Sequence, residues 1–213
     1  MDITIEDIQK YFPHLSDSQL DQLKALPHLY KDWNDKINVI SRKDTDHIYE
    51  HHVLHSMTLA KYCSFAAGTE LLDLGTGGGF PGIPLAILYP QCQFTLIDGT
   101  GKKIKVVQEI SQSIGLQNVE AIQVRAEELK QRRFDFVVTR AVAKLDMLWT
   151  WSQRLIHTQH KNALPNGLLA LKGGQLKSEV KALPRGLDVD ILPINKLINR
   201  RYYDEKYIVY VQK

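Results

Sequence analysis

The chain has few of the residues that mark secreted or zinc-bound proteins. Its 213 residues include only two cysteines, Cys63 and Cys92, which lie far apart and form no C-x-x-C pair. This usage indicates neither a disulfide framework nor a zinc ribbon. The sequence also lacks a run of about 18 apolar residues and a signal-peptide pattern at its start. We therefore expect a cytoplasmic protein that does not associate with membranes.

An excess of charge of one sign is absent as well. Lys and Arg number 27 and Asp and Glu number 24, which gives a net charge of +3. Proteins with a dedicated nucleic-acid tail are far more basic. With 44% hydrophobic residues, a chain of this length can bury one good core. We expect residues 67–213 to form one α/β domain and residues 1–66 to form a helical extension in front of it.

The most informative segment is an apolar run that ends in a glycine-rich turn. Residues 71–74 read Leu-Leu-Asp-Leu, and Gly75, Gly77 and Gly79 follow at alternate positions. Glycines adopt positive φ angles and let backbone N–H groups approach a ligand, and the helix that follows presents free N–H groups to it. The pattern therefore predicts a loop that binds a nucleotide cofactor.

Three nucleotide-binding patterns can be compared with this loop. The dinucleotide pattern G-x-G-x-x-G fails when it is counted from the first glycine, because its sixth position is Phe80. A match that begins at Gly77 starts two residues late. The P-loop pattern G-x-x-x-x-G-K-[ST] is missing. Asp73 followed by G-x-G-x-G is similar to the first motif of class I S-adenosylmethionine (SAM) methyltransferases, so we expect SAM as the cofactor.

A second acidic residue supports a nucleotide cofactor. The apolar run over 94–98 ends in Asp98, about 20 residues after the loop. A carboxylate at the tip of the second strand can accept hydrogen bonds from ribose hydroxyls. The alternative is a solvated turn residue before Gly99. Because the glycine loop lies upstream, we favour the ribose contact.

The rest of the chain alternates apolar runs with helical patterns. Strands are expected at 71–74, 94–98, 120–124, 134–139, 168–171, 187–194 and 207–211, and helices at 81–88, 102–114, 144–158 and 175–183. Such alternation builds a doubly wound parallel sheet, and the short link between the last two strands allows an antiparallel return. The predicted fold is α/β and Rossmann-like, with a seven-stranded, mostly parallel sheet and an N-terminal helical extension.

The extension itself has two helical segments. Ser16 and Gln19 form a capping box at the start of the first helix, in which Pro27 is expected to cause a kink or a restart. A second helix is expected over 45–65. Its histidines His47 and His51, with His55, recur every four residues and fall on one face. This spacing can present imidazoles to a metal, but we favour a polar face or a substrate-facing wall and assign no metal.

Basic residues gather near the predicted strand ends and in loops. Arg125, Arg140 and Lys172 directly follow the third, fourth and fifth strands. In an open α/β sheet the carboxyl ends of the strands form the ligand face, so we expect these three side chains to contact a ligand rather than to be ordinary surface charges. The other basic residues of this kind are Arg42-Lys43, Lys102-Lys103, Arg132-Arg133, Lys144 and Arg200-Arg201.

Short motifs along nearly the whole chain resemble those of one family. The longest reads Asp-Leu-Gly-Thr-Gly-Gly-Gly-Phe-Pro-Gly-Ile-Pro over residues 73–84. The others are Trp33-Asn34, Ile37-Asn38, His52 with Ser56, Gly101-Lys102-Lys103, Arg125-Ala126-Glu127-Glu128, Thr139-Arg140-Ala141 and Leu171-Lys172-Gly173. Their order is similar to that in the small-subunit ribosomal RNA methyltransferase G family, also called glucose-inhibited division protein B. The resemblance implies a SAM-dependent enzyme that methylates N7 of one guanine in 16S ribosomal RNA.

The same resemblance implies ligand contacts, with Asp98 at the ribose, Ala126 and Glu127 near the adenine, and Arg140 where cofactor and RNA meet. The expected cofactor-binding residues are Gly75, Gly77, Gly79, Phe80, Asp98, Ala126, Glu127 and Arg140. The expected RNA-binding residues are Arg125, Arg140, Lys172 and His52. The implied partner is 16S ribosomal RNA or the small ribosomal subunit, and we expect a monomer. Many members have Arg and Asp where this chain has His51 and His55.

The residues after the fourth strand bear on the target atom. Enzymes that methylate exocyclic amines usually carry [DNS]-P-P-[YF] there, whereas this chain has Thr-Arg-Ala-Val at 139–142. C5 methylation of pyrimidines needs a cysteine nucleophile that the loops lack. Guanine N7 has an exposed lone pair and no proton, so its methylation needs alignment and no general base. We assign no catalytic acid or base; a methyltransferase for another RNA, a protein or a small molecule, and an NAD-binding module, stay open.

Overall fold

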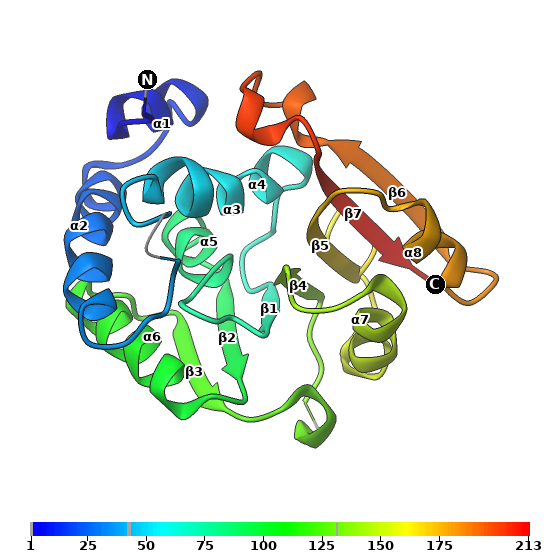
Figure 1. Ribbon diagram of the computed structural model, residues 1–213. Coiled ribbons are helices and arrows are strands. Elements are labelled where there is room, and N and C mark those ends of the chain that lie inside the picture. The colour runs from blue at the N-terminus through cyan, green and yellow to red at the C-terminus, as the bar shows by residue number, and fades with distance from the viewer. Residues whose placement is uncertain (1, 42–43, 131) are drawn as a thin grey trace.

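A computed structural model describes residues 2–41, 44–130 and 132–213. Its centre is a seven-stranded sheet in the order β3-β2-β1-β4-β5-β7-β6 (Figure 1). The strands are β1 Glu70–Leu74, β2 Gln93–Asp98, β3 Val119–Gln123, β4 Phe136–Arg140, β5 Gly167–Gly173, β6 Asp188–Pro193 and β7 Lys206–Gln212. The pairs from β3 to β5 are parallel, whereas β7 is antiparallel to both β5 and β6. The predicted Rossmann-like fold is confirmed.

The strand order reverses between β1 and β4, because the chain first adds β2 and β3 on one side of β1 and then β4 and β5 on the other. Helices that leave neighbouring strands in opposite directions open a crevice at such a switch point, beyond the carboxyl ends of the strands. The glycine loop follows β1 directly. The topology therefore places this loop at the crevice.

Helices cover both faces of the sheet (Figure 1). One face carries α1 Ile5–Tyr11, α2 Asp17–Asn34, α3 His55–Met57, α4 Leu59–Tyr62, α5 Gly82–Leu88 and α6 Gly101–Ser113, and the other carries α7 Leu145–Ser152 and α8 Lys177–Ala182. Side chains of β1 alternate between the two cores, with Leu71 in one and Leu72 and Leu74 in the other. Within the described ranges, no helix is long and apolar enough to cross a membrane.

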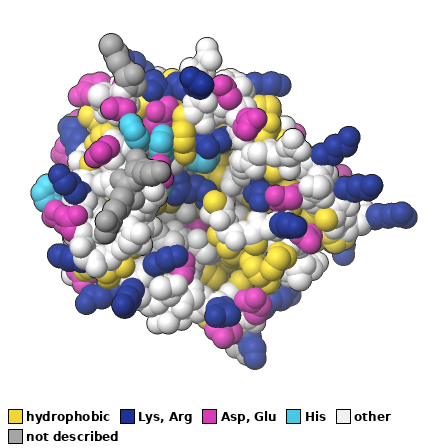
Figure 2. Space-filling model, in the orientation of Figure 1, with side chains coloured by type: hydrophobic (Ala, Val, Ile, Leu, Met, Phe, Trp, Pro, Cys, Tyr) yellow, Lys and Arg dark blue, Asp and Glu magenta, His cyan; other side chains and the backbone are white. Residues whose placement is uncertain are grey.

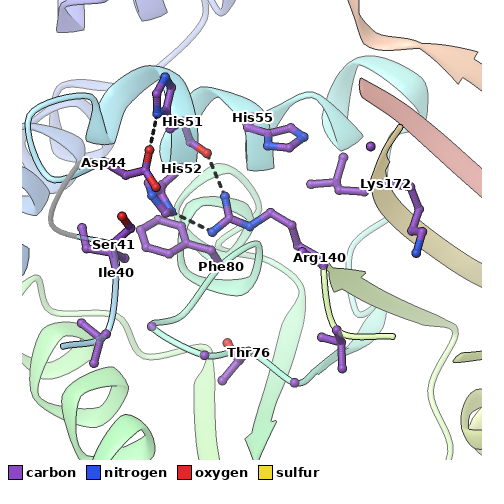
Figure 3. Close-up of a pocket in the computed structure, with 18 of the residues that line it drawn as sticks. Ile40, Ser41, Asp44, His51, His52, His55, Thr76, Phe80, Arg140 and Lys172 are labelled. Carbon is purple, nitrogen blue, oxygen red and sulfur yellow. Dashed lines mark hydrogen bonds and ion pairs between the residues drawn. The ribbon is translucent and has the colours of Figure 1, made fainter. Parts of the chain in front are cut away.

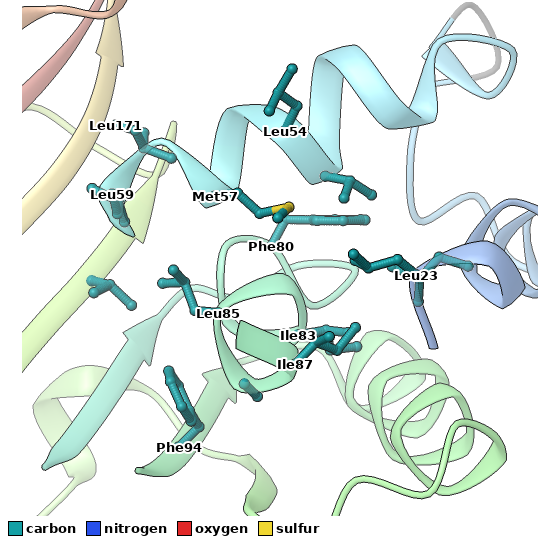
Figure 4. Packing of buried hydrophobic residues seen from close by; sticks show 14 of the residues in the cluster. Leu23, Leu54, Met57, Leu59, Phe80, Ile83, Leu85, Ile87, Phe94 and Leu171 are labelled. Carbon is teal, nitrogen blue, oxygen red and sulfur yellow. The ribbon is translucent and has the colours of Figure 1, made fainter. Parts of the chain in front are cut away.

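The larger core joins the N-terminal helices to the sheet. Leu54 and Met57 pack with Phe80, Ile83 and other side chains of the glycine loop and α5 (Figure 4). All four are buried, and each such side chain contributes roughly 1.5–3 kcal/mol to folding. The N-terminal helices therefore share one core with the loop that they cover.

Helix α2 contains Pro27 and is not interrupted there, so the predicted restart is wrong. Proline has no N–H to donate to the carbonyl of Leu23, four residues earlier. The Tyr49 hydroxyl donates to that carbonyl instead, at 3.4 Å. The predicted capping box of Ser16 and Gln19 is confirmed at the start of the same helix.

The helix expected over 45–65 is divided into a π-helix, Tyr49–Leu54, and the short helices α3 and α4. The wider turns of the π-helix change the pattern of backbone hydrogen bonds. The His51 carbonyl accepts side-chain hydrogen bonds from Arg140 and Tyr202. Other boundaries also differ from expectation. Helix α7 ends at Ser152, and a 3-10 turn, Gln153–Leu155, follows. Strand β4 extends to Arg140 and β5 to Gly173, so that Arg140 and Lys172 lie inside their strands.

Candidate active site

Asp73 holds the glycine loop between β1 and α5 in shape. Its Oδ2 accepts hydrogen bonds from the Thr76 hydroxyl at 2.6 Å and from the Gly82 backbone N–H at 2.8 Å. These bonds join the end of the strand to the start of the helix. Asp73 is fully buried, and burial raises its pKa to about 7. The structure therefore gives this motif residue a structural role.

The three alternate glycines of the loop have different roles. Their φ angles are 71° at Gly75, 58° at Gly77 and 96° at Gly79, values that favour glycine. A Cβ at Gly75 would lie 2.6 Å from Val142, and one at Gly79 would lie 2.5 Å from Ile83, so these two glycines permit close packing. A Cβ at Gly77 would meet nothing within 4 Å. A ligand therefore has room over Gly77.

Tyr30 of α2 supports the loop from the N-terminal region. Its hydroxyl donates to the Gly78 carbonyl at 2.5 Å, and its ring centre lies 4.8 Å from that of Phe80. Burial raises the pKa of Tyr30 well above its usual value, which keeps the hydroxyl protonated as a donor. The sequence pattern around Tyr30 does not distinguish this contact from ordinary core packing.

Asp98 ends β2 and faces the same loop. Its Oδ2 accepts from the Gly77 N–H at 3.1 Å, its Oδ1 accepts from the Thr100 N–H at 2.8 Å, and Lys103 Nζ lies 3.8 Å away. Because each carboxylate oxygen has two lone-pair sites, acceptor capacity is left for a ligand hydroxyl. The predicted ribose contact stays a prediction, and the geometry is compatible with it.

Two cavities meet at the glycine loop. The larger has a volume of about 660 Å³ and includes Gly77, Phe80 and Arg140 in its lining (Figure 3). It lies in a face that is hollowed at its centre, with Lys and Arg side chains around the hollow (Figure 2). The smaller has about 350 Å³, and its lining includes Arg125, Ala126, Glu127 and Trp151. Both are lined by Gly75, Asp98 and Val142.

Arg140 is the last residue of β4. It is fixed by the N-terminal wall of the larger cavity, which consists of the lining residues that precede the glycine loop (Figure 3). Its Nη1 donates to the His51 carbonyl at 2.8 Å, its Nη2 donates to His52 Nδ1 at 2.7 Å, and the guanidinium lies 5.2 Å from the centre of the Phe80 ring. Arginine is always a donor, so His52 accepts at Nδ1 and is neutral. Burial and the Arg140 charge lower the pKa of His52 to about 3.

His52 was expected to contact RNA, and the structure gives it a nearer partner. The side chain is 8% exposed, and its Nε2 is buried without a partner among the described residues. The geometry supports a role in positioning Arg140. The RNA contact of His52 stays a prediction.

The three histidines predicted on one face have different surroundings. His47 Nδ1 lies 3.0 Å from an Asp2 carboxylate oxygen, and His51 Nδ1 lies 2.6 Å from Asp44 Oδ1. His55 is 6% exposed, and neither ring nitrogen has a hydrogen-bond partner in the described part of the chain. Across residues 2–41, 44–130 and 132–213, no three His, Cys, Asp or Glu side chains are grouped to hold a metal.

The three basic residues expected to contact a ligand line two different cavities. Arg140 and Lys172 line the larger cavity, whereas Arg125 lines the smaller one. Lys172 Nζ lies 2.8 Å from Glu179 Oε2 and donates to the Ala143 carbonyl at 2.8 Å, so its charge is balanced. Sequence reasoning missed Lys206, which also lines the larger cavity. It is the first residue of the last strand, and only its place at that strand end could have marked it.

The other basic residues noted in the sequence lie in different places. Arg132 donates to Glu120 at 2.7 Å and to the Thr95 hydroxyl at 3.0 Å, and with Arg133 it lines a separate cavity. Arg42 and Lys43 lie outside the described residues. Lys103 alone of the pair at 102–103 lines the larger cavity.

The sequence matches a known family and close relatives. The family described as rRNA small subunit methyltransferase G (GidB) matches residues 19–197. The chain is 51% identical over 207 residues to the ribosomal RNA small subunit methyltransferase G of Phocaeicola vulgatus, covering 97% of this chain and 98% of that protein. It is 50% identical over 208 residues to the protein of the same name from Bacteroides thetaiotaomicron, covering 98% of this chain and 100% of that one.

Solved structures of low sequence identity share the fold. A variant of MtNAS in complex with S-adenosylmethionine has a TM-score of 0.59 at 14% identity, over 99% of this chain and 84% of that one. A precorrin-6y methyltransferase from Geobacter metallireducens has a TM-score of 0.57 at 14% identity, over 83% of this chain and 91% of that one. The family match and the two relatives decide the assignment: the chain belongs to the rRNA small subunit methyltransferase G family.

Proposed function

We propose that this protein transfers a methyl group from SAM to N7 of a guanine in 16S ribosomal RNA. The observation that carries the proposal is the junction of two cavities at Gly75, Asp98 and Val142, with Arg140 on the larger side. The smaller cavity suits a nucleoside, and the larger cavity offers cations to an anionic substrate. The family and the names of its relatives support ribosomal RNA as that substrate.

The residues at the junction fit SAM. The space over Gly77 is open, Asp98 borders both cavities, and the backbone around Ala126 lines the smaller one. In this assignment Asp98 binds the ribose, Ala126 and Glu127 border the adenine, and the loop lies along the remainder. When bound, SAM supplies an electrophilic methyl group on a sulfonium.

The side chains of the larger cavity suit an acceptor that has no proton to lose. Its imidazoles at 52 and 55 are neutral, and burial lowers both pKa values. Asp44 is paired with His51, and Asp98 is paired with Lys103. Guanine N7 carries a free lone pair, so alignment and electrostatics can supply the rate enhancement without a general base.

Arg140 is the residue that we assign to alignment. It is held at three points, by His51, His52 and Phe80, and lies between the cofactor loop and the rest of the larger cavity (Figure 3). A guanidinium in this place can donate to O6 of the guanine beside N7. Its fixed position costs little entropy when the substrate binds.

The partner in this proposal is 16S ribosomal RNA or the small ribosomal subunit, bound by a monomer. Ribosome assembly takes place in the cytoplasm, which is the compartment that the proposed substrate requires. The division into an extension at 1–66 and a methyltransferase domain at 67–213 stays a prediction. The molar mass of the purified protein, measured by light scattering, checks whether it is a monomer.

The test is to incubate the purified protein with SAM and either 16S ribosomal RNA or small subunits, and then to map methylated bases. We expect one guanine to gain an N7 methyl group, and the Asp98→Ala variant to lose this product when SAM is limiting. A methyl group at another atom, transfer only to a protein or small molecule, or binding of NAD in place of SAM would contradict the proposal.

A further inference from the structure

The larger cavity continues beyond Arg140 to Gly173, Tyr202 and Lys206. Lys206 begins β7 and is the register partner of Gly173 on β5. The strand order places β1, β4, β5 and β7 side by side, so β7 is three strand spacings from the strand that carries the cofactor loop. At about 4.8 Å per spacing, this separation is roughly 14 Å. Lys206 therefore borders the far side of the cavity from the cofactor loop.

The charges around this far side do not balance. The carboxylates near the cavity are engaged: Asp98 faces Lys103, and Glu179 holds Lys172. Asp44 is paired with His51. Among the described residues, neither Arg140 nor Lys206 has a carboxylate oxygen within ion-pair distance. Arg140 and Lys206 thus line one cavity without an ion-pair partner in the described part of the chain.

Lys206 is held in place without being neutralised. Its Nζ lies 4.2 Å from the centre of the Tyr202 ring, in a cation–π contact. The other face of that ring stacks on His51 at 3.9 Å and an interplanar angle of 10°. Burial lowers the pKa of Lys206, and the Arg140 charge lowers it further. With contacts on both faces, Tyr202 has no free face on which a base could stack.

We propose that Lys206, together with Arg140, forms a phosphate subsite that holds the RNA backbone next to the target guanosine. This inference rests on the proposed function and deepens it. A phosphate between the two cations would relieve their repulsion and gain charge-assisted hydrogen bonds. Phosphate contacts fix the register of a nucleic acid on a protein, so this one would set where the guanine lies relative to Arg140.

The experiment compares Lys206→Ala and Lys206→Arg with Lys181→Ala, a control at an exposed lysine of α8. Single-turnover methylation of ribosomal RNA is measured against RNA concentration at several salt concentrations, and SAM affinity is measured by calorimetry. For Lys206→Ala we expect about tenfold weaker half-saturation by RNA and a salt slope smaller by about 0.7–0.9, the contribution of one phosphate. We expect Lys206→Arg to restore both the half-saturation by RNA and the salt slope. SAM affinity and the thermal melt should stay unchanged in both Lys206 variants.

Three results would overturn the inference. An unchanged salt slope in Lys206→Ala would mean that no phosphate is bound there. A loss of SAM affinity equal to the loss of RNA affinity would assign Lys206 to the cofactor carboxylate. The same loss in Lys181→Ala would make the effect one of general surface charge. Methylation of RNA by the wild-type protein is read first, so that failure of the proposed function is recognised separately.

Discussion

The two cavities that meet at the glycine loop are built in different ways. The smaller is lined by residues that follow three strands close together in the chain, over 74–75, 97–100 and 124–127, with Val142 and Trp151 added from one later segment. The larger is lined by residues from the ranges 39–41, 44–55, 75–80, 98–103, 140–142, 171–173 and 202–206. One cavity is therefore mostly local in sequence, whereas the other needs both ends of the chain.

This difference has a consequence for the chemistry. The local cavity depends on backbone conformation, in particular the positive φ angles of the loop and the carboxylate of Asp98 that accepts from it. The long-range cavity depends on side chains that hold one another, such as His52 and Arg140. Changes in the first should affect cofactor binding, and changes in the second should affect the methyl-transfer step and RNA binding.

The largest effect is expected from Gly77→Val, which fills the open space over the loop. We expect SAM affinity to fall by about 100-fold or more, because the side chain occupies the space that a ligand needs. Gly115→Val is the matched control: Gly115 also has a positive φ, of 70°, and a Cβ there meets nothing within 4 Å. Calorimetry and thermal melts check both variants. Equal losses of SAM affinity would show that backbone strain alone explains the result.

Arg140→Ala should give the second largest effect, on the methyl-transfer step rather than on cofactor binding. We expect the single-turnover rate at saturating RNA to fall by about 100-fold, because small misplacements of reacting groups are costly. SAM affinity should change much less. Arg133→Ala, at an exposed arginine beside a separate cavity, is the control. A variant that lost SAM binding and kept its rate would place Arg140 in the cofactor site.

The sequence was sufficient for the sheet, the glycine loop and Asp98, because hydrophobic periodicity and glycine spacing are local properties. The sequence was insufficient to predict how the side chains that line the larger cavity are paired. Whether Lys172 or Lys206 carries unbalanced charge depends on Glu179 of α8, which only the tertiary structure brings within 2.8 Å of Lys172. The hydrogen-bond partners of the His51 carbonyl within the π-helix at 49–54 likewise come from distant segments, from β4 and from residue 202.

Buried histidine in the wall should make stability depend on pH. Burial holds the pKa of His55 well below its ordinary 6.5, so below that pH the unfolded chain takes up a proton that the folded protein does not. Stability is therefore lost as pH falls, by about 1.4 kcal/mol per pH unit for this residue. His55→Phe removes the loss. The free energy of unfolding of wild type and of His55→Phe is measured by denaturant melts from pH 7 to 5. His52 and Asp73 are present in both proteins, so their contributions cancel in the comparison. Parallel stability curves would contradict the assignment.

The smallest functional effect is expected from Lys172→Met. Since its ammonium is bound by Glu179 and Ala143, we expect RNA half-saturation to change by less than about threefold, with a cost in stability of roughly 1–3 kcal/mol for the acceptors left without a partner. The double change Lys172→Met with Glu179→Gln should recover part of that stability. A reduced salt slope for RNA binding in the single variant would show that Lys172 contacts a phosphate after all.

We propose that methyl transfer in this protein proceeds by alignment and without a general base. A single-turnover pH series at saturating RNA and SAM, on wild type, Arg140→Ala and His52→Ala, distinguishes the two mechanisms. Without a base, the rate should be nearly flat from about pH 5.5 to 8 in all three proteins, with both variants slower throughout because Arg140 is lost or released. A steep rise with pH in the histidine range that disappears in His52→Ala would show instead that a base is required.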